Sequence, residues 1–573
     1  MGYRLGGPLV LLLGSLSLSC TTQPTQVPSS PSGGGGLYWG KDRRGNPTLI
    51  QRGESVLHKS DIEKHHDEHV QDFSSILKQR TQSGLYGLIQ IGRGSQTSNR
   101  VHDQSYKQGA MKLDMSKLTH IIHVDKEKLI VRAEPLCTMQ QLVDATLPHG
   151  LLPKVVPEFK HITVGGAIMG AALESTSHAH GQFLDCCASV TLLLPDGRVE
   201  VASHTQNVEL FHSLSGSYGT LAILLDAHIE LQMVAASHVK VTYTLHRDID
   251  SGIEAMQALC ASETPPEFVE GLQLPHSEEI VVCQGAFFSP DMGGKLKVSN
   301  FDRPGREWYY EHVEDVAKKL RKQAGGGAAQ ETTRSELIPL REYLFRYDYG
   351  AFWMARPMSF SSMHTRLTPS NLMLFAMSSN FPLVRRLFGW LFSTRRLFSM
   401  LRLAPQDIVA QRMIIMDVYM PVKEAGGLVK RIRGTVPIST PLWLCPVSGC
   451  KDRQEFSPHG HHPGLLINVG IYGRVCDNEG RRYSRELEVY AAAHGGRKML
   501  YSQNFYTEAE FWGRAGDEWK ETMFDESKYR RMRSATSAEN VLPDLYTKVC
   551  ESARPPPSDS LSAKFKRAVA RLM

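Results

Sequence analysis

The sequence lacks the cysteine spacing that would build a disulfide framework or a zinc site. Ten cysteines occur in 573 residues, yet none forms a CxxC pair and their spacings do not repeat. Free, buried thiols in a reducing compartment are therefore expected. A dominant charge of one sign is lacking too, because 65 Lys and Arg residues face 59 Asp and Glu residues. The net charge of +6 is too dilute for a nucleic-acid-binding surface, so no nucleic-acid partner is expected.

The apolar run near the N-terminus, residues 8–18, is too short to span a bilayer, since a helix of that length rises only about 16 Å against a hydrocarbon core of ~30 Å. Arg4 precedes this run and small residues lead to Cys20, which is the order of a signal sequence. Residues 1–20 are expected to be a cleaved signal, a lipoprotein-like signal ending at Cys20, or a weak membrane anchor. Residues 21–36 are rich in Pro, Ser, Thr and Gly, which predicts a flexible linker.

Clustered histidines give little support for a metal. His65 and His69 would share one face of a helix, but Val70, Phe73 and Leu77 follow at helical spacing, which favours a surface helix with its polar face outward. The second cluster consists of His459, His461 and His462. No metal site is expected at either place.

Glycine is abundant, and it gathers where strands end. Residues 85–91 form a candidate strand that runs into a loop of glycine and small hydroxyl residues. Such a loop can aim successive backbone N–H groups at a diphosphate. It is no Rossmann fingerprint, because another strand, near residues 111–113, follows instead of a helix. The candidate ligand-binding residues of this loop are Gly92, Gly94, Ser95, Gln96 and Thr97.

The segments that follow alternate between hairpins and helices. Residues 121–124 and 129–133 form one predicted hairpin, and residues 190–194 and 199–201 form another around the turn Pro195-Asp-Gly197. Thr138 is placed to cap a helix over residues 139–148, and a short helix is expected over residues 209–214. The pattern predicts an α+β domain.

Residues 163–170 read Thr-Val-Gly-Gly-Ala-Ile-Met-Gly. Four small residues among these let the backbone press directly against a flat ligand. A glycine pair that packs one helix closely against its neighbour explains the composition equally well. From composition alone both interpretations stay open.

Together these pieces resemble the FAD-binding domain of the vanillyl-alcohol-oxidase type, also called the PCMH type. The resemblance extends to the Δ24-sterol reductase branch, related to plant Diminuto, over about residues 58–553. It rests on ten segments that occur in the same order: residues 130–136, 163–170, 174–178, 268–272, 339–343, 387–390, 443–446, 469–473, 499–501 and 510–512.

The resemblance implies FAD held without a covalent bond, because the loop at residues 92–99 contains no His or Cys. It further implies hydride transfer from NADPH through the flavin to the side-chain double bond of a sterol. Besides the loop residues above, the implied FAD contacts are Thr163, Val164, Gly165, Gly166, Ala167, Ile168, Met169, Gly170, Ala171, Ala172, Leu173, Glu174, Ser175, His178, Gly219 and Thr220. The alternatives are an oxidase or dehydrogenase of an alcohol or lactone, and a non-catalytic flavin- or lipid-binding protein.

The expected organisation is a PCMH-type FAD-binding domain of two subdomains over residues 37–231, then an α+β substrate domain over 232–553 and a basic tail over 554–573. Residues 381–403 mix arginines with large apolar residues. They are read either as a helix in a membrane interface or as one buried against the substrate domain. Membrane association at the cytosolic side of the endoplasmic reticulum follows from the resemblance.

An isolated alkene needs a proton donor together with the hydride. Tyr501, Tyr506 and Glu174 are candidates by residue type and neighbourhood only. A structural role is the alternative for each of them, so the sequence identifies no catalytic residue.

Overall fold

The computed structural model describes residues 37–41, 47–51, 59–84, 87–94, 107, 109–289, 296–302, 305–323, 332–354, 382–450 and 454–550. The chain divides into two units, residues 1–58 and residues 59–573. In the first unit β1 (Leu37–Lys41) pairs antiparallel with β2 (Pro47–Gln51). The predictions for residues 1–20, 21–36 and 554–573 lie outside the described residues, and the predicted start of the FAD-binding domain at residue 37 falls in the first unit.

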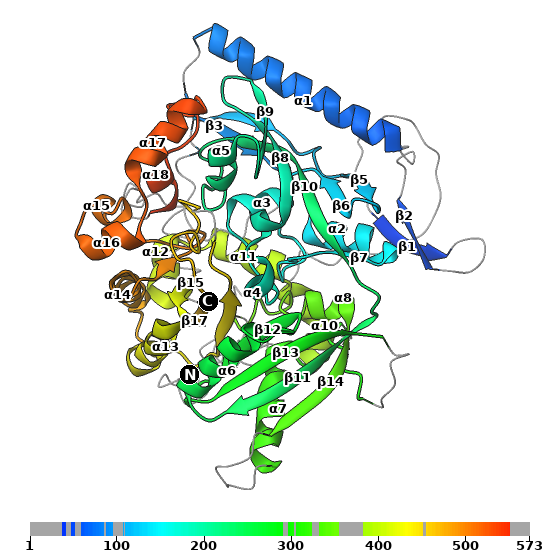
Figure 1. The fold of residues 1–573 in the computed structure, drawn as a ribbon, viewed down its shortest axis with the longest axis vertical. Coiled ribbons are helices and arrows are strands. Elements are labelled where there is room, and N and C mark those ends of the chain that lie inside the picture. The colour runs from blue at the N-terminus through cyan, green and yellow to red at the C-terminus, as the bar shows by residue number, and fades with distance from the viewer. Residues whose placement is uncertain are drawn as a thin grey trace, which may run out of the picture. The chain divides into compact units, whose positions relative to one another are not determined.

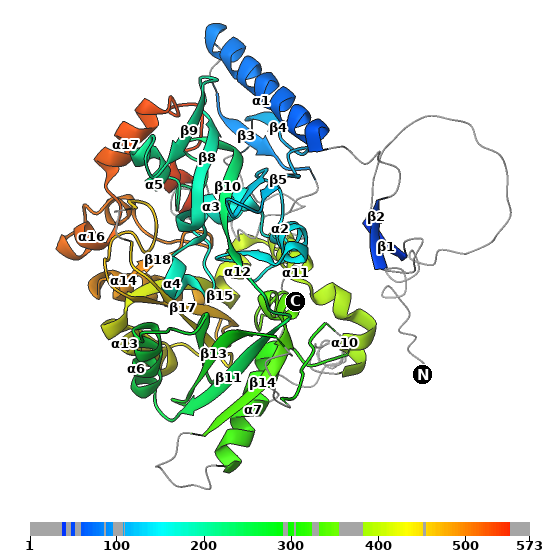
Figure 2. The same cartoon turned by 45° about the vertical axis from the view of Figure 1, so that its right-hand side comes forward.

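The second unit begins with a helix laid over a six-stranded sheet (Figures 1 and 2). The sheet has the order β5-β6-β10-β8-β9, and a further strand, β7, pairs with β10. Its strands are β5 (Ile121–Asp125), β6 (Ile130–Ala133), β7 (Leu151–Pro153), β8 (Cys187–Leu193), β9 (Val199–Ser203) and β10 (Ile223–Met233). Both predicted hairpins are confirmed as β5-β6 and β8-β9. Beside this sheet β3 (Ile89–Gly92) pairs in parallel with β4 (Met111–Asp114).

The covering helix α1 (Lys59–Gln82) buries Phe73 and Leu77, as its spacing predicts. It approaches the β8-β9 turn closely at Gly197, whose φ is +89°. The Ser74 hydroxyl donates to the Gly197 carbonyl at 2.6 Å, and a Cβ at Gly197 would lie 2.7 Å from the Ser74 carbonyl oxygen. Glycine is therefore required there for contact with the helix as well as for the turn.

Short helices connect these strands. The helix predicted after Thr138 is confirmed as α2 (Met139–Thr146), where Thr138 and Gln141 form a reciprocal capping box. The other helices of this half are α3 (Val164–Met169), α4 (Ser177–His180) and α5 (Val208–His212), with 3-10 turns η3 (Leu147–His149) and η4 (Phe183–Cys186).

The second sheet has eight antiparallel strands in the order β14-β11-β13-β12-β16-β17-β15-β18. They are β11 (His238–His246), β12 (Phe268–Gln273), β13 (Ile280–Phe288), β14 (Thr333–Pro339), β15 (Met413–Pro421), β16 (Leu442–Val447), β17 (Leu466–Arg474) and β18 (Arg497–Lys498). One face packs a separate apolar core against α6 (Ile249–Cys260), α13 (Val422–Thr435) and α14 (Gly480–Ala493). The opposite face carries Asp417, Trp443 and Tyr472 and contributes to the pocket described below.

Other helices surround this second half: α7 (Tyr309–Gln323), α8 (Leu340–Leu344), α10 (Pro382–Phe388), η7 (Gly389–Phe392), α11 (Thr394–Leu403), α12 (Gln406–Arg412), α15 (Glu508–Phe511) and α16 (Asp517–Thr522). The stretch at residues 381–403 is thus several short helices and not one long helix. An α+β fold is confirmed. No helix in the described ranges is long and apolar enough to cross a membrane.

The last described helices, α17 (Glu526–Ala535) and α18 (Leu545–Val549), return to the first sheet and lie beside α5 (Figure 1). Ala538 and Leu542 share an apolar core with Leu77, Leu113 and other residues of the first half. The Arg533 guanidinium donates to the Thr220 carbonyl at 2.8 Å. The C-terminal segment therefore completes the half of the molecule that contains the glycine-rich segments. The predicted FAD-binding domain, residues 37–231, does not include this segment, because the contacts join residues hundreds of positions apart in the sequence.

Candidate active site

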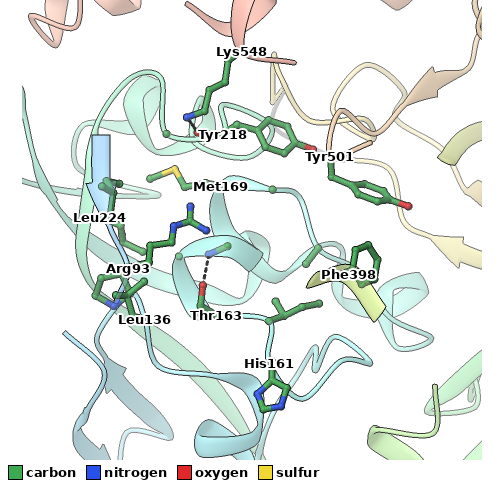
Figure 3. A pocket seen from close by; sticks show the side chains of 18 of the residues that line it. Arg93, Leu136, His161, Thr163, Met169, Tyr218, Leu224, Phe398, Tyr501 and Lys548 are labelled. Carbon is green, nitrogen blue, oxygen red and sulfur yellow. Dashed lines mark hydrogen bonds between the residues drawn. The ribbon is translucent and has the colours of Figure 1, made fainter. Parts of the chain in front are cut away.

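A cavity of about 470 Å³ lies between the first sheet, the C-terminal return and the second sheet. This size falls within the usual range for small-molecule and cofactor sites. Figure 3 shows Arg93 and Lys548, from opposite ends of the chain, on one side of α3, and Tyr501 and Phe398 on the other. The pocket therefore joins a basic region to an aromatic one.

The short helix α3 forms the floor between these regions. Thr163 caps it, with its hydroxyl oxygen accepting from the Gly166 amide at 3.2 Å (Figure 3). The Gly165 amide donates to the Pro135 carbonyl at 2.8 Å, and a Cβ on Gly165 would lie 3.1 Å from that same oxygen. Gly165 and Gly166 also line the pocket. The glycines of residues 163–170 therefore allow close packing against Pro135 and also border the pocket, whereas contact with a flat ligand stays a prediction.

The predicted FAD contacts divide into three groups. Ten line the pocket: Gly92, Gly94, Thr163, Gly165, Gly166, Met169, Gly170, Ala172, Leu173 and Gly219. Eight are buried but do not line it: Val164, Ala167, Ile168, Ala171, Glu174, Ser175, His178 and Thr220. The remaining three, Ser95, Gln96 and Thr97, lie outside the described residues. Contact of any of these residues with FAD stays a prediction.

Glu174 and His178 support the glycine segment on the side that faces away from the pocket. The Glu174 carboxylate accepts from Arg346 Nη2 at 2.6 Å, and both side chains are almost fully buried. The ring nitrogens of His178 lie 3.0 Å from the carbonyl oxygens of Ser175 and Pro266. Neither residue reaches the pocket, so a role for Glu174 as the proton donor has no geometric support.

The lining fits the two ends of FAD. Arg93, Lys107, Lys112 and Lys548 line the pocket as cations, and a diphosphate needs such charges together with exposed backbone amides. Lys548 Nζ is directed by a hydrogen bond to the Tyr218 carbonyl at 2.6 Å. Aromatic side chains provide flat apolar contacts for a ring system: Phe352, Phe398 and Trp443.

Asp417 lies at the aromatic side, on the pocket face of the second sheet. Along β15, Met416 and Val418 point into the core under α13, so Asp417 points the other way. Gly470 stands opposite Asp417 in β17, and its missing side chain leaves room for the neighbours on that strand. The Asp417 carboxylate accepts from Asn468 at 2.7 Å, from Tyr472 at 2.7 and 2.8 Å, and from Tyr501 at 2.7 Å.

Burial governs the acid–base properties of this group. It raises the pKa of Asp417, while the three donors act in the opposite direction. Burial, followed by the charge of Asp417, raises the pKa of the Tyr501 phenol well above its usual value. Tyr501 is the one candidate acid of the sequence that lines the pocket, and Tyr506 packs instead against Phe511 and Trp519.

Glu158, Asp417 and Tyr472 line the pocket and were missed by sequence reasoning. A single aspartate in the otherwise apolar run of residues 413–421 is a usable signal, because a buried carboxylate in a strand needs partners. Glu158, in a loop, left no comparable signal.

The region expected at a membrane is partly buried. Arg385 pairs with Glu311 and is 8% exposed. In α11, Phe398 and Arg402 line the pocket, which supports the buried interpretation for that helix. In α10, Leu383 and Leu387 are 67% and 56% exposed, so this short segment retains an apolar surface.

One cluster in the described ranges offers three potential metal ligands, Asp185, Cys450 and His459, whose ligand atoms lie within 4.8 Å of one another. His459 Nε2 is 3.0 Å from Asp185 Oδ2, and its Nδ1 contacts the Ser457 hydroxyl at 2.5 Å. Hydrogen bonds already occupy both ring nitrogens, which accounts for the burial of His459. His461 and His462 are not part of this cluster.

Comparison with known proteins bears on the whole chain. The FAD binding domain family matches residues 68–203. Δ24-sterol reductases from Homo sapiens and Macaca fascicularis are 29% and 28% identical over 509 and 512 residues, in each case 87% of this chain and 89% of the relative. The Δ24-sterol reductase of Pisum sativum is 25% identical over 534 residues, 86% of this chain and 85% of the relative. The protein is thus an FAD-dependent oxidoreductase with a PCMH-type FAD-binding domain, similar along most of its length to the Δ24-sterol reductases.

Proposed function

We propose that this protein reduces the Δ24 side-chain double bond of a sterol, with NADPH as the reductant and FAD bound without a covalent link. The observation that carries the proposal is the pocket itself, which joins the glycine segment of the FAD-binding half to buried acids and aromatic rings of the second sheet. The names of the relatives supply the substrate class.

Bound FAD supplies hydride transfer, first from NADPH and then to the alkene. In this chain, α3 and the four cations bind and orient the cofactor, and Phe352 and Trp443 exclude water from the reacting face. Side chains that could donate a proton line the same pocket: Glu158, Tyr472 and Tyr501. A reductase needs such a donor, whereas an oxidase or dehydrogenase needs a base in the same place. Burial raises the pKa of Glu158, which lines the pocket, well above its usual value, and this favours the reductase.

The test is an anaerobic titration of the yellow holoenzyme. NADPH is expected to bleach the flavin absorbance, and a Δ24 sterol is expected to restore it. The same sterol with a saturated side chain is the control and should leave the flavin reduced. Flavin that NADPH leaves oxidised would rule out the reductant. Restoration by an alcohol or lactone pair in place of the alkene would assign the protein to the oxidase class. Release of flavin on acid precipitation tests the non-covalent link.

We further propose that the protein acts at the cytosolic surface of the endoplasmic reticulum membrane, where sterols are dissolved. The exposed leucines of α10 beside the exposed Arg386 support contact with an anionic bilayer surface. Co-sedimentation with anionic vesicles is expected, and Leu383→Ser with Leu387→Ser should weaken it. Equal sedimentation of the wild type and the double variant would contradict a role for α10.

A further inference from the structure

Glu158 stands where the FAD-binding half meets the aromatic wall of the pocket. It precedes Thr163 by five positions in the loop after β7, and it is 8% exposed with its side chain lining the cavity. Phe159 beside it packs on Phe352 and Phe398, with ring centroids 5.6 and 6.2 Å apart. These rings keep the surroundings of the Glu158 carboxyl poor in water.

The other acidic groups of the pocket, Asp417, Tyr472 and Tyr501, are hydrogen-bonded to one another. Both oxygens of Asp417 accept hydrogen bonds, and the hydroxyl protons of Tyr472 and Tyr501 point at those oxygens. A hydroxyl proton engaged in this way is not available to a substrate unless the network opens. Within the described part of the chain, the Glu158 carboxyl accepts a hydrogen bond from its own backbone amide and forms none to another residue. Unlike Asp417, Glu158 therefore has a carboxyl group whose proton is not engaged by another residue.

The electrostatic surroundings favour the protonated form of Glu158. Burial raises the pKa of Glu158 well above its usual value, the charges of Glu174 and Asp417 raise it further, and Arg346 offsets part of the effect. The ionised form of Glu158 would in turn raise the pKa of Tyr472 and Tyr501, so the four groups lie in one electrostatic cluster. These effects favour the carboxylic acid form of Glu158 over the carboxylate.

We propose that Glu158 is the proton donor of the reaction and delivers its carboxyl proton directly to the substrate alkene. This rests on the proposed function. One alkene carbon receives a hydride, with its electron pair, from the reduced flavin, which is thereby reoxidised. The π electrons form a C–H bond at the other carbon with the proton that leaves Glu158. The product has two new C–H bonds, and the Glu158 carboxylate regains its proton from water before the next turnover.

Asp417, Tyr472 and Tyr501 are positioning residues in this scheme. Their hydrogen bonds fix the wall against which the substrate lies, and the charge of Asp417 contributes to the raised pKa of Glu158.

The first test separates the two half-reactions of the holoenzyme. Glu158→Gln keeps the shape of the side chain but has no acidic proton. Reduction of its flavin by NADPH is expected at the wild-type rate, whereas reoxidation by a Δ24 sterol should slow about 100-fold or more, the usual contribution of a general acid. Glu158→Asp should restore part of the rate. Glu267→Gln is the matched control, since burial also raises the pKa of Glu267 but the residue lies outside the pocket lining.

The second test needs no turnover. Infrared spectra of the wild-type holoenzyme at pH 7 should contain the carbonyl band of a protonated carboxylic acid that disappears in Glu158→Gln and persists in Glu267→Gln. Wild-type reoxidation rates in Glu158→Gln, or an unchanged carboxyl band, would overturn the role of Glu158 alone. Reduced wild-type flavin that the sterol fails to reoxidise would instead overturn the proposed function, and this role with it.

Discussion

Single glycines decide how closely the pocket walls can approach. Gly165 sits under the pocket floor, where a Cβ would lie 3.1 Å from the Pro135 carbonyl oxygen and 3.2 Å from the Pro135 Cβ. Neither atom belongs to a flexible side-chain end, so the helix itself has to move.

Gly165→Ala is therefore expected to displace α3 and lower the flavin content of the purified protein. The ratio of flavin to protein absorbance measures it. Gly434→Ala in α13 is the control, because nothing lies within 4 Å of its added Cβ. That change should leave the flavin content unaltered and raise stability by up to about 1 kcal/mol through helix propensity. Equal flavin content in all three proteins would contradict the assignment of α3.

Gly470 has a comparable effect on the opposite wall. A Cβ there would lie 2.8 Å from the Tyr472 hydroxyl and 3.1 Å from Asp417 Oδ1. Gly470→Ala is expected to separate that pair and to lower the free energy of unfolding by roughly 1–3 kcal/mol, as overpacking does. Urea denaturation and the near-ultraviolet circular dichroism of the tyrosines report the two effects. An unchanged tyrosine spectrum would show that the wall tolerates the methyl group.

At the scale of elements, α1 is held on the first sheet by a buried ionic group. His66 Nδ1 lies 2.9 Å from Glu134 and Nε2 lies 3.0 Å from Asp226, with Arg132 adding a 3.0 Å contact to Asp226. Burial alone would lower the pKa of His66, but the hydrogen bonds to the two carboxylates raise it to about 9. The pKa of Asp226 falls to about 2 despite burial, because His66 and Arg132 donate to it.

The pH dependence of stability follows from these shifts. Because the folded pKa of His66 exceeds its usual 6.5, its contribution is complete below pH 6.5 and disappears as pH rises to about 9. A shift of this size corresponds to on the order of 3 kcal/mol. His66→Gln should therefore be much less stable than the wild type at pH 6 and differ little from it above pH 9. Parallel pH profiles would contradict this, and His65→Gln, at an exposed position, is the control.

Elements set by local chemistry could be predicted from the sequence, whereas their side-chain partnerships could not. The turn at Gly197 and the cap at Thr138 depend on residues within a few positions of each other. The burial of His66 within an apparently polar helix depends on Asp226, 160 residues away. Tyr501 and Asp417 are separated by 84 positions and meet only through strand order and register. The periodicity of the sequence contains no information on the order of the strands in the sheet, so Glu158, Asp417 and Tyr472 could not be predicted as pocket residues.

At the scale of the molecule, one arginine ties the two halves together. Arg346, which is 4% exposed, bonds Glu174 behind the glycine segment at 2.6 Å and Glu270 of β12 at 2.8 and 3.1 Å. It also lies over the ring of Tyr343, 4.3 Å from the centroid.

Arg346→Met would leave two buried carboxylates without their cation. Loss of one partner from a buried ion pair typically costs about 3–5 kcal/mol, and a loss of that order is expected in urea denaturation. Arg531→Ala, which removes an exposed ion pair with Glu209, should change stability little. A small effect of Arg346→Met would mean that the carboxyls take up protons without strain.

The return of residues 538–548 to the first sheet has a consequence for synthesis. Roughly 300 residues, or about 15 to 60 seconds of translation, separate β10 from the segment that fills its core. Until then Phe73, Leu77 and Leu113 lack part of their apolar cover, and Lys548 has not reached the pocket. The half of the molecule that the ribosome makes first is therefore finished last, because its apolar core stays open until Ala538 and Leu542 have been made.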